Sequence, residues 1–285
     1  MAERHFACTQ CGKCCNRPPE VELGEAAALA DVFVWQLLFR LYSLPRSVAD
    51  YLQPGMARDQ GSAEFYESKR LLGQFAAHSW NGKVRRDGRV VERTFTLTIS
   101  ALALDQGGGA CSALGADGSC TVYGRRPLSC RSVPMHYSRG EAFAAGDFDM
   151  FLALPGHACD DSDQAPALIE AGKIVNPAIL AARTEALTQS QTDRLWKQAL
   201  VKEMKAGRHG LPSLRAVEEN AARGALTSPL RFGWQVAVEA GLLSADECAA
   251  LVEKQLEAID RFLVDPSVTS PARASALDLR RFLSA

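Results

Sequence analysis

Four of the nine cysteines of this chain lie within one stretch of eight residues near its start, at Cys8, Cys11, Cys14 and Cys15. A reduced cysteine is a small apolar residue that proteins usually scatter through a core. The C-x2-C-x2-C-C spacing is different, because two C-x2-C steps bring thiolates within reach of one metal centre. Gly12 lets the backbone turn tightly after the second cysteine. The stretch therefore predicts metal binding.

Four more cysteines follow much later, and eight in all are candidate metal ligands: Cys8, Cys11, Cys14, Cys15, Cys111, Cys120, Cys130 and Cys159. The ninth, Cys248, lies in an apolar series behind Ser244-Ala245-Asp246-Glu247, a pattern typical of a capped amphipathic helix. We expect Cys248 to pack in the core rather than to bind metal.

The redox state of the cysteines decides between disulfides and metal ligands. An odd number cannot all pair, and residues 1–6 are polar where a secretion signal would need an apolar core. The most apolar run, Val32–Leu44, contains Gln36 and Arg40 and is too short to span a bilayer. We therefore expect a cytoplasmic protein without a membrane partner, in which reduced thiols bind metal ions.

Charge and composition exclude one class of partner. The formal net charge is −1, which gives no electrostatic footprint for nucleic acid. Basic residues gather between Lys83 and Arg93, but Asp87 and Glu92 interrupt them, as on a solvated hairpin face. No nucleic-acid partner is expected.

The adjacent pair Cys14 and Cys15 bears on the kind of metal centre. Neighbouring side chains diverge, so each of these two thiols more naturally serves a different metal, unless one is a spare. Cys8-x2-Cys11-x2-Cys14 matches the first three ligands of the bacterial ferredoxin run for a 4Fe–4S cluster, without the C-x3-C-Pro that follows there. Structural zinc favours separated C-x2-C pairs, which the later cysteines lack. The sequence favours an iron–sulfur cluster over zinc, and leaves open two four-cysteine sites or one multinuclear cluster.

Other residues near the cysteines are candidates for supporting roles. Arg125, Arg126 and Arg131 flank Cys130, where guanidinium groups can hydrogen-bond sulfur or simply lie on the surface. His136 and His157 are close enough in sequence to be ligands or donors to ligands. No catalytic residue is indicated.

The secondary-structure pattern predicts an α+β protein. We expect a cysteine-rich metal-binding domain over residues 1–165. Its expected helices are one over Gly24–Tyr42 and several short pieces over Ser47–Gln74. Its expected β structure is a hairpin about Asp87-Gly88 and short strands at Thr94–Ile99 and Thr121–Tyr123. The pattern over residues 166–285 predicts an all-helical region. This region is either a second domain or a helical layer on the first domain. That region carries no recognisable chemistry and is a candidate surface for a protein partner.

Two motifs carry a resemblance to a known family: Phe6-x-Cys8-x2-Cys11-Gly12-Lys13-Cys14-Cys15 and Gly118-Ser119-Cys120-Thr121-Val122-Tyr123-x2-Arg126-Pro127-Leu128-x-Cys130-Arg131-x2-Pro134. Together they resemble the YkgJ-type CxxCxxCC family, a zinc- or iron-chelating domain of iron–sulfur-cluster-containing proteins. The resemblance covers residues 6 to about 159 and implies metal binding by the same eight cysteines. It implies no settled activity.

The resemblance leaves two classes of function open. One is a metal protein whose iron–sulfur cluster or zinc is structural, redox-active or a sensor. The alternative is a protein-modifying enzyme such as a lysine N-methyltransferase, because a related cysteine-cluster domain occurs in flagellin methylases. The chain lacks a glycine-rich nucleotide fingerprint after a strand and lacks the C-x3-C-x2-C run of radical S-adenosylmethionine enzymes.

Overall fold

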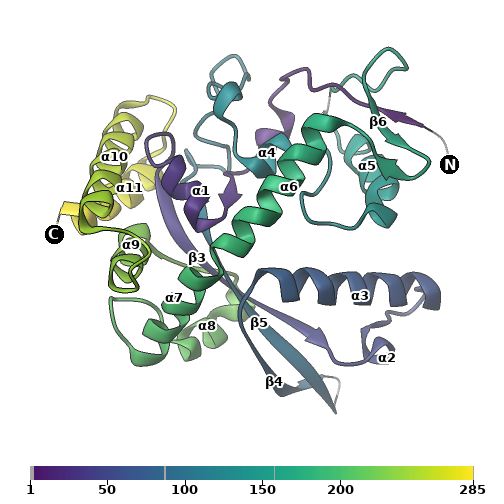
Figure 1. Cartoon of the computed structure of the whole chain (residues 1–285), viewed down its shortest axis with the longest axis horizontal. Helices are drawn as coiled ribbons and strands as arrows, with labels where there is room; N and C mark the ends of the chain where they lie inside the picture. The colour runs from purple at the N-terminus through teal and green to yellow at the C-terminus, as the bar shows by residue number, and fades with distance from the viewer. Residues whose placement is uncertain (1–2, 87, 157, 285) are drawn as a thin grey trace.

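A twisted antiparallel sheet forms the centre of the molecule in the computed structural model, which describes residues 3–86, 88–156 and 158–284 (Figure 1). The order of the main sheet is β2-β5-β3-β8, and β4 pairs with β5. A smaller sheet has the order β1-β6-β7. The strands are β1 Arg4–His5, β2 Glu20–Val21, β3 Trp35–Pro45, β4 Ala76–Arg86, β5 Arg89–Ala103, β6 Ala167–Glu170, β7 Lys173–Ile174 and β8 Leu226–Pro229.

Helices surround this sheet, with α10 and α11 at one end of the molecule and α5 at the other (Figure 1). The helices are α1 Leu23–Ala28, α2 Val48–Tyr51, α3 Arg58–Phe75, α4 Leu128–Arg131, α5 Ala144–Leu152, α6 Pro177–Thr192, α7 Arg194–Ala206, α8 Leu214–Asn220, α9 Leu230–Glu239, α10 Ala245–Val264 and α11 Ser270–Ser284. The mixture of helix and sheet confirms the α+β class.

The helix predicted over Gly24–Tyr42 is wrong beyond its first turns. Only α1 is helical there, and β3 follows as the long central strand that pairs with β5 and β8. Leu37, Leu38 and Phe39 are successive residues and are all buried, so both faces of β3 are covered. A strand buried on both faces has a continuous apolar run that periodicity cannot distinguish from a buried helix.

The predicted hairpin is confirmed by the pairing of β4 with β5, whose register places Arg86 opposite Arg89. Asp87 itself lies outside the described residues. The short strand predicted at Thr121–Tyr123 is wrong: a 3-10 turn covers Tyr123–Arg125, and the local β pairing is a single bridge between Leu114 and Cys120.

The region after residue 165 is not all-helical as predicted, because it supplies β6, β7 and β8. These strands have two to four residues, too few for a recognisable period. Its long helices were predicted well. A break at Asp193 separates α6 from α7, and the capping box at Ser244 and Glu247 starts α10.

Two hydrophobic cores hold the fold together, and both cross the boundary proposed at residue 165. The larger core joins Leu37 and Ile99 of the sheet to Trp234 and Ile259 of the later helices. The smaller core lies beneath the chain start and contains Phe6, Phe148, Leu168 and Ile169. Residues 166–285 therefore pack as a layer on the elements of residues 1–165.

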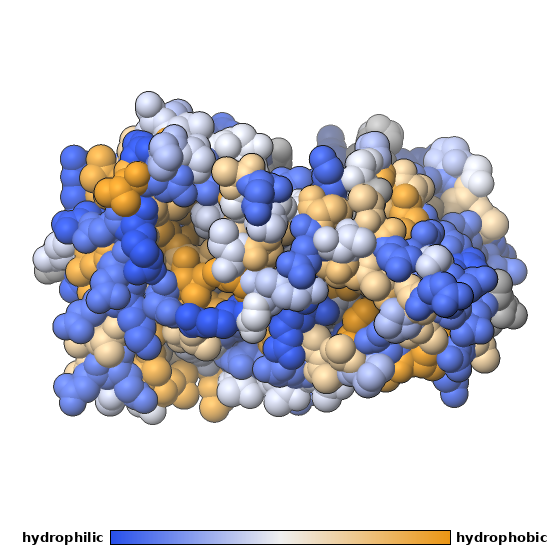
Figure 2. Space-filling view, turned by 90° about the horizontal axis from the view of Figure 1, so that it is seen from above, coloured by the Kyte–Doolittle hydropathy of each residue, from blue (hydrophilic) through white to orange (hydrophobic). Residues whose placement is uncertain are grey.

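The surface is mixed in character. On the face in Figure 2, hydrophilic residues are interspersed with small apolar groups. Within the described ranges, no helix combines the length and the apolar character that crossing a membrane requires.

Candidate metal centre

The start of the chain is held against Cys159 by a short antiparallel bridge. The backbone N–H of Ala7 donates to the carbonyl of Asp160 at 2.7 Å, and the N–H of Asp160 donates to the carbonyl of Ala7 at 3.1 Å. The same register places Cys8 opposite Cys159. The hydroxyl of Thr9 donates to the carbonyl of Ala158 at 2.7 Å and extends this contact by one residue.

Cys14 and Cys15 lie on a 3-10 turn, Lys13–Cys15, that begins after Gly12. Gly12 has a φ of 70°, a left-handed conformation that favours glycine, and its carbonyl accepts the N–H of Cys15 at 2.9 Å. The carbonyl of Cys15 in turn accepts the N–H of Cys111 at 3.1 Å. This bond attaches the first cysteine stretch to the later one.

Cys111 and Cys120 lie at the two ends of one tight loop. The Leu114–Cys120 bridge closes it, and the N–H of Thr121 donates to the carbonyl of Ala113 at 2.9 Å. Cys111 is buried and Cys120 is partly exposed.

Cys130 lies on α4, the short helix that follows Pro127. Its N–H donates to the carbonyl of Pro127 at 2.9 Å. The start of α4 is held by Glu25, whose carboxylate accepts the N–H of Leu128 at 2.5 Å.

The thiols affect one another's protonation. A hydrogen bond with Cys14, then burial and the charges of Cys111 and Cys120, raises the pKa of Cys15. Burial, followed by the charge of Cys111, raises the pKa of Cys130 to about 12.

Cys159 and Cys11, which interact with each other, differ in the direction of their pKa shifts. Burial, followed by the charges of Cys11 and Cys8, raises the pKa of Cys159 to about 11. The backbone N–H of Lys13 donates to the Cys11 sulfur and lowers the pKa of that thiol. Thiols with raised pKa values keep their protons at neutral pH, so metal binding at them releases protons.

The spacing of the sulfurs limits the kind of metal centre. All nine cysteines are free thiols. Among the described residues, no three of their sulfurs all lie within 4.8 Å of one another. A tetrahedral zinc ion with Zn–S bonds of about 2.3 Å needs its sulfurs about 3.8 Å apart. The thiols are therefore spread more widely than the ligands of a single ion.

The flanking arginines have partners other than sulfur. Arg125 forms a bidentate ion pair with Asp31 at 2.8 Å, and Arg131 pairs with Glu185 at 3.2 Å. Arg126 stacks on the ring of Tyr123, with its guanidinium carbon 3.7 Å from the ring centroid.

The two histidines give little support to a ligand role. His136 is an exposed residue, although partial desolvation of its ring lowers its pKa, and its Nδ1 lies 3.0 Å from the hydroxyl of Ser138. His157 lies outside the described residues.

Tyr123 belongs to the site, although sequence reasoning assigned it only to a strand. Burial raises the pKa of its phenol, and the Cys8 thiol contributes through its charge and a hydrogen bond. The signal available in the sequence was its place in the Cys120-to-Cys130 motif.

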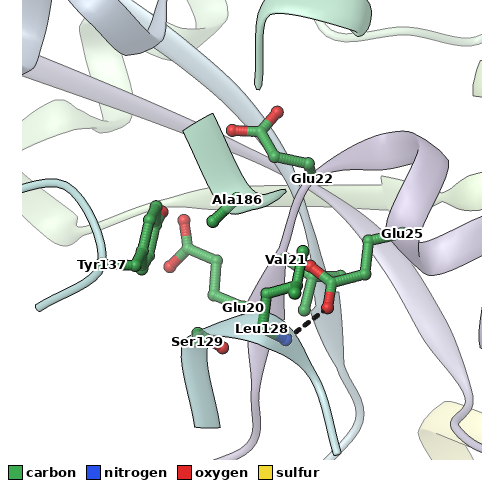
Figure 3. Close-up of a pocket in the computed structure, with 8 residues that line it drawn as sticks. All are labelled: Glu20, Val21, Glu22, Glu25, Leu128, Ser129, Tyr137 and Ala186. Atoms are coloured by element: carbon green, nitrogen blue, oxygen red, sulfur yellow. Dashed lines mark hydrogen bonds between the residues drawn. The ribbon is translucent and has the colours of Figure 1, made fainter. Parts of the chain in front are cut away.

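A small cavity lined by carboxylates lies beside α4, with room for about one water molecule (Figure 3). Glu20 approaches it from β2, Glu25 from α1 and Glu22 from the position between them, and Tyr137 lies opposite. Each carboxylate has a protein partner. Glu20 pairs with Arg40, Glu25 accepts the Leu128 N–H, and Lys197 Nζ lies 2.5 Å from Glu22 Oε2 without hydrogen-bond alignment.

One further cluster has ligand-like geometry. Within the part of the chain that the structure describes, Glu203, His209 and Glu239 are the one group whose ligand atoms all lie within 4.8 Å. The carboxylate of Glu203 already accepts two bonds from Arg208, at 2.5 and 2.7 Å. This group is therefore an ion-pair network between α7 and α9.

Searches against protein-family models, curated proteins and solved structures find no match to this chain. The family resemblance of the two cysteine motifs stays a prediction. The candidate centre is therefore argued from its own geometry.

Proposed function

We propose that this protein binds an iron–sulfur cluster through the thiolates of its eight candidate cysteines. On this proposal it is a cytoplasmic metal protein. One observation carries the proposal. Backbone bonds bring the chain start against both Cys111 and Cys159, although about 100 and 150 residues separate them in sequence. Free cysteines that only fill a core are usually scattered through it, whereas these come together from distant parts of the chain.

The chemistry of the donors supports iron–sulfur over zinc. The candidate ligands are thiols, which suit zinc and iron–sulfur clusters alike. Their wide spacing favours a cluster, because several metal ions and bridging sulfides fill more space than one ion. Zinc remains the competing metal, and its binding would require the sulfur atoms to move closer to one another.

Most of the candidate thiols are shielded from water. Cys14 is exposed, whereas the other seven are partly or fully buried. Burial beside apolar residues and backbone N–H donors sets the potential of a thiolate-bound cluster. This environment suits a redox, sensing or structural centre. The experiment below identifies the metal first, because the role of the centre depends on which metal it holds.

The first experiment is anaerobic purification followed by analysis of iron, zinc and acid-labile sulfide, with a visible absorption spectrum. Iron and sulfide in similar amounts, with a broad visible band, support the proposal. Colourless protein with stoichiometric zinc replaces the cluster by a structural zinc site. Protein without metal, even after reconstitution with ferrous iron and sulfide, refutes the proposal.

A matched set of variants tests the ligand assignment. Cys11→Ala and Cys130→Ala should lose bound metal and stability, because metal binding and folding are coupled. Cys248→Ala is the control. Cys248 is partly buried against the larger core on α10, as predicted. Equal metal content in all three variants would contradict the assignment.

A further inference from the structure

We propose that the eight cysteines form two separate four-thiolate centres rather than one eight-thiolate cluster. The first centre consists of Cys8, Cys11, Cys14 and Cys159. The second consists of Cys15, Cys111, Cys120 and Cys130. The division rests on the proposed function and adds the number of centres and the ligands of each.

The first centre follows from the pairing of the chain start with Cys159. The two bonds between Ala7 and Asp160 make them a hydrogen-bonded pair, so the next pair in that register is Cys8 with Cys159. Cys8 and Cys159 are therefore a non-hydrogen-bonded pair. In such a pair the Cα atoms are about 4.5 Å apart and the side chains share one face of the bridge. The Cys11 thiol hydrogen-bonds with Cys159, which completes three of the four ligands.

The second centre is built around the bond between Cys111 and Cys15. That bond fixes Cys15 beside the loop whose ends are Cys111 and Cys120. Cys130 reaches the same place from α4, where its strongest thiol interaction is with Cys111. Three segments of the chain thus supply the four ligands, with two of them from a single loop.

The two groups of thiols pack against different cores. Cys8 and Cys159 lie on the smaller core, which contains Phe6 and Phe148. Cys111 belongs to the larger core, and Cys15 packs against it. Because each hydrophobic cluster supports its own thiols, the groups are held as two units.

Cys14 lies between the two groups of thiols, and it is the last ligand to be assigned to a centre. Its thiol interacts with Cys159 on one side and with Cys15, Cys111 and Cys130 on the other. The thiols of Cys14 and Cys15 are hydrogen-bonded to each other, so Cys14 lies where the two groups meet. Cys15, Cys111, Cys120 and Cys130 already supply four ligands to the second centre. Since the backbone places Cys15 with Cys111, the C-x2-C-x2-C run assigns Cys14 to the first centre, as its fourth ligand.

The test compares metal content per chain in reconstituted full-length variants. Cys159→Ala and Cys111→Ala should each retain about half of the iron and sulfide of the wild type. The double variant Cys8→Ala/Cys159→Ala, within one centre, should also retain half. The double variant Cys159→Ala/Cys111→Ala, across the centres, should retain none. Far-UV circular dichroism verifies that each variant is folded.

Two outcomes overturn the division. One is the loss of all metal in a folded single variant, which indicates a shared cluster. The other is a greater loss in the within-centre double variant than in Cys159→Ala alone. Absence of metal from the wild type is a different result, because it refutes the proposed function itself.

A measurement on the wild type avoids variants that fail to fold. After reduction with dithionite, two iron–sulfur centres should give an electron paramagnetic resonance signal that integrates to two spins per chain, with splitting from their mutual interaction. One spin per chain in fully loaded protein overturns the division. If the metal is zinc, two ions per chain support it and any other stoichiometry overturns it.

Discussion

Gly12 lies so close to Gly118 that a Cβ atom at position 12 would be 2.0 Å from the Gly118 carbonyl oxygen. This contact joins the first cysteine stretch to the turn between Cys111 and Cys120. The backbone there is also left-handed, so only glycine meets both conditions.

Gly12→Ala should therefore destabilise the protein and reduce its metal content, as thermal unfolding and metal analysis would show. The matched control is Gly55→Ala, where φ is 85° but nothing lies within 4 Å of the added Cβ. The control carries only the left-handed penalty, about 1–2 kcal/mol. Equal losses in the two variants would show that the Gly12–Gly118 contact is unimportant.

Gln255 is the clearest structural link between α10 and the sheet. Its side chain is buried, accepts the N–H of Trp35 at 2.9 Å and donates to the carbonyls of Ala30 and Phe33 at 2.6 Å each. Gln255→Met should leave three buried backbone groups without partners and lower the free energy of unfolding by about 3 kcal/mol. Urea denaturation measures this, with the exposed Gln191→Met as control. A change no larger than that of the control would remove the proposed link.

The buried pair Glu22 and Lys197 should show strong coupling. Their side chains are 8% and 4% exposed, and burial raises the pKa of Glu22. Lys197→Met should destabilise the protein by about 3 kcal/mol, because Glu22 remains buried without its cation. Adding Glu22→Gln should restore much of this loss. The exposed pair Arg215 and Glu219 is the control, and its coupling should be much weaker because water screens it. Comparable coupling energies in the two double-mutant cycles would contradict the prediction.

Glu25 should make stability fall as the pH rises towards neutrality. Burial raises the pKa of this carboxyl from 4.5 to about 7, so the folded state holds its proton more tightly than the unfolded state does. The penalty is absent below about pH 4.5, grows between the two pKa values and is complete above about pH 7, where it amounts to about 3 kcal/mol.

Glu25→Gln removes this titration while keeping an acceptor for the Leu128 N–H. The stability of the variant relative to the wild type should therefore rise between pH 5 and pH 8, as chemical denaturation at each pH would show. Glu219→Gln, on an exposed surface, is the control. A pH-independent difference for Glu25→Gln would show that its pKa is close to the ordinary value.

The parts of the fold that sequence predicted well are those with local signals. Ser244 and Glu247 form the capping box through side-chain and backbone bonds within four residues of each other. The two-residue connection between Arg86 and Arg89 likewise needs only local turn chemistry. In both cases the residues that decide the structure are neighbours in the chain.

The misassigned elements depend on distant partners. β3 is a strand because β5 and β8 cover its edges, and its apolar run alone does not reveal them. β8 has only four residues, and its pairing with β3 defines it. Of the site, sequence indicated the eight thiols. It did not indicate the bonds from Ala7 to Asp160 or from Cys15 to Cys111, because such pairing is set by tertiary structure.

The bridge between Ala7 and Asp160 also has a consequence for synthesis. Cys8 leaves the ribosome about 150 residues before Cys159, the residue opposite it in the fold. At typical elongation rates this interval is roughly 10–30 s. During that time the proposed first centre has three of its four ligands and lacks the last. On this proposal the first cysteines can bind no complete centre until about the midpoint of the chain has been translated.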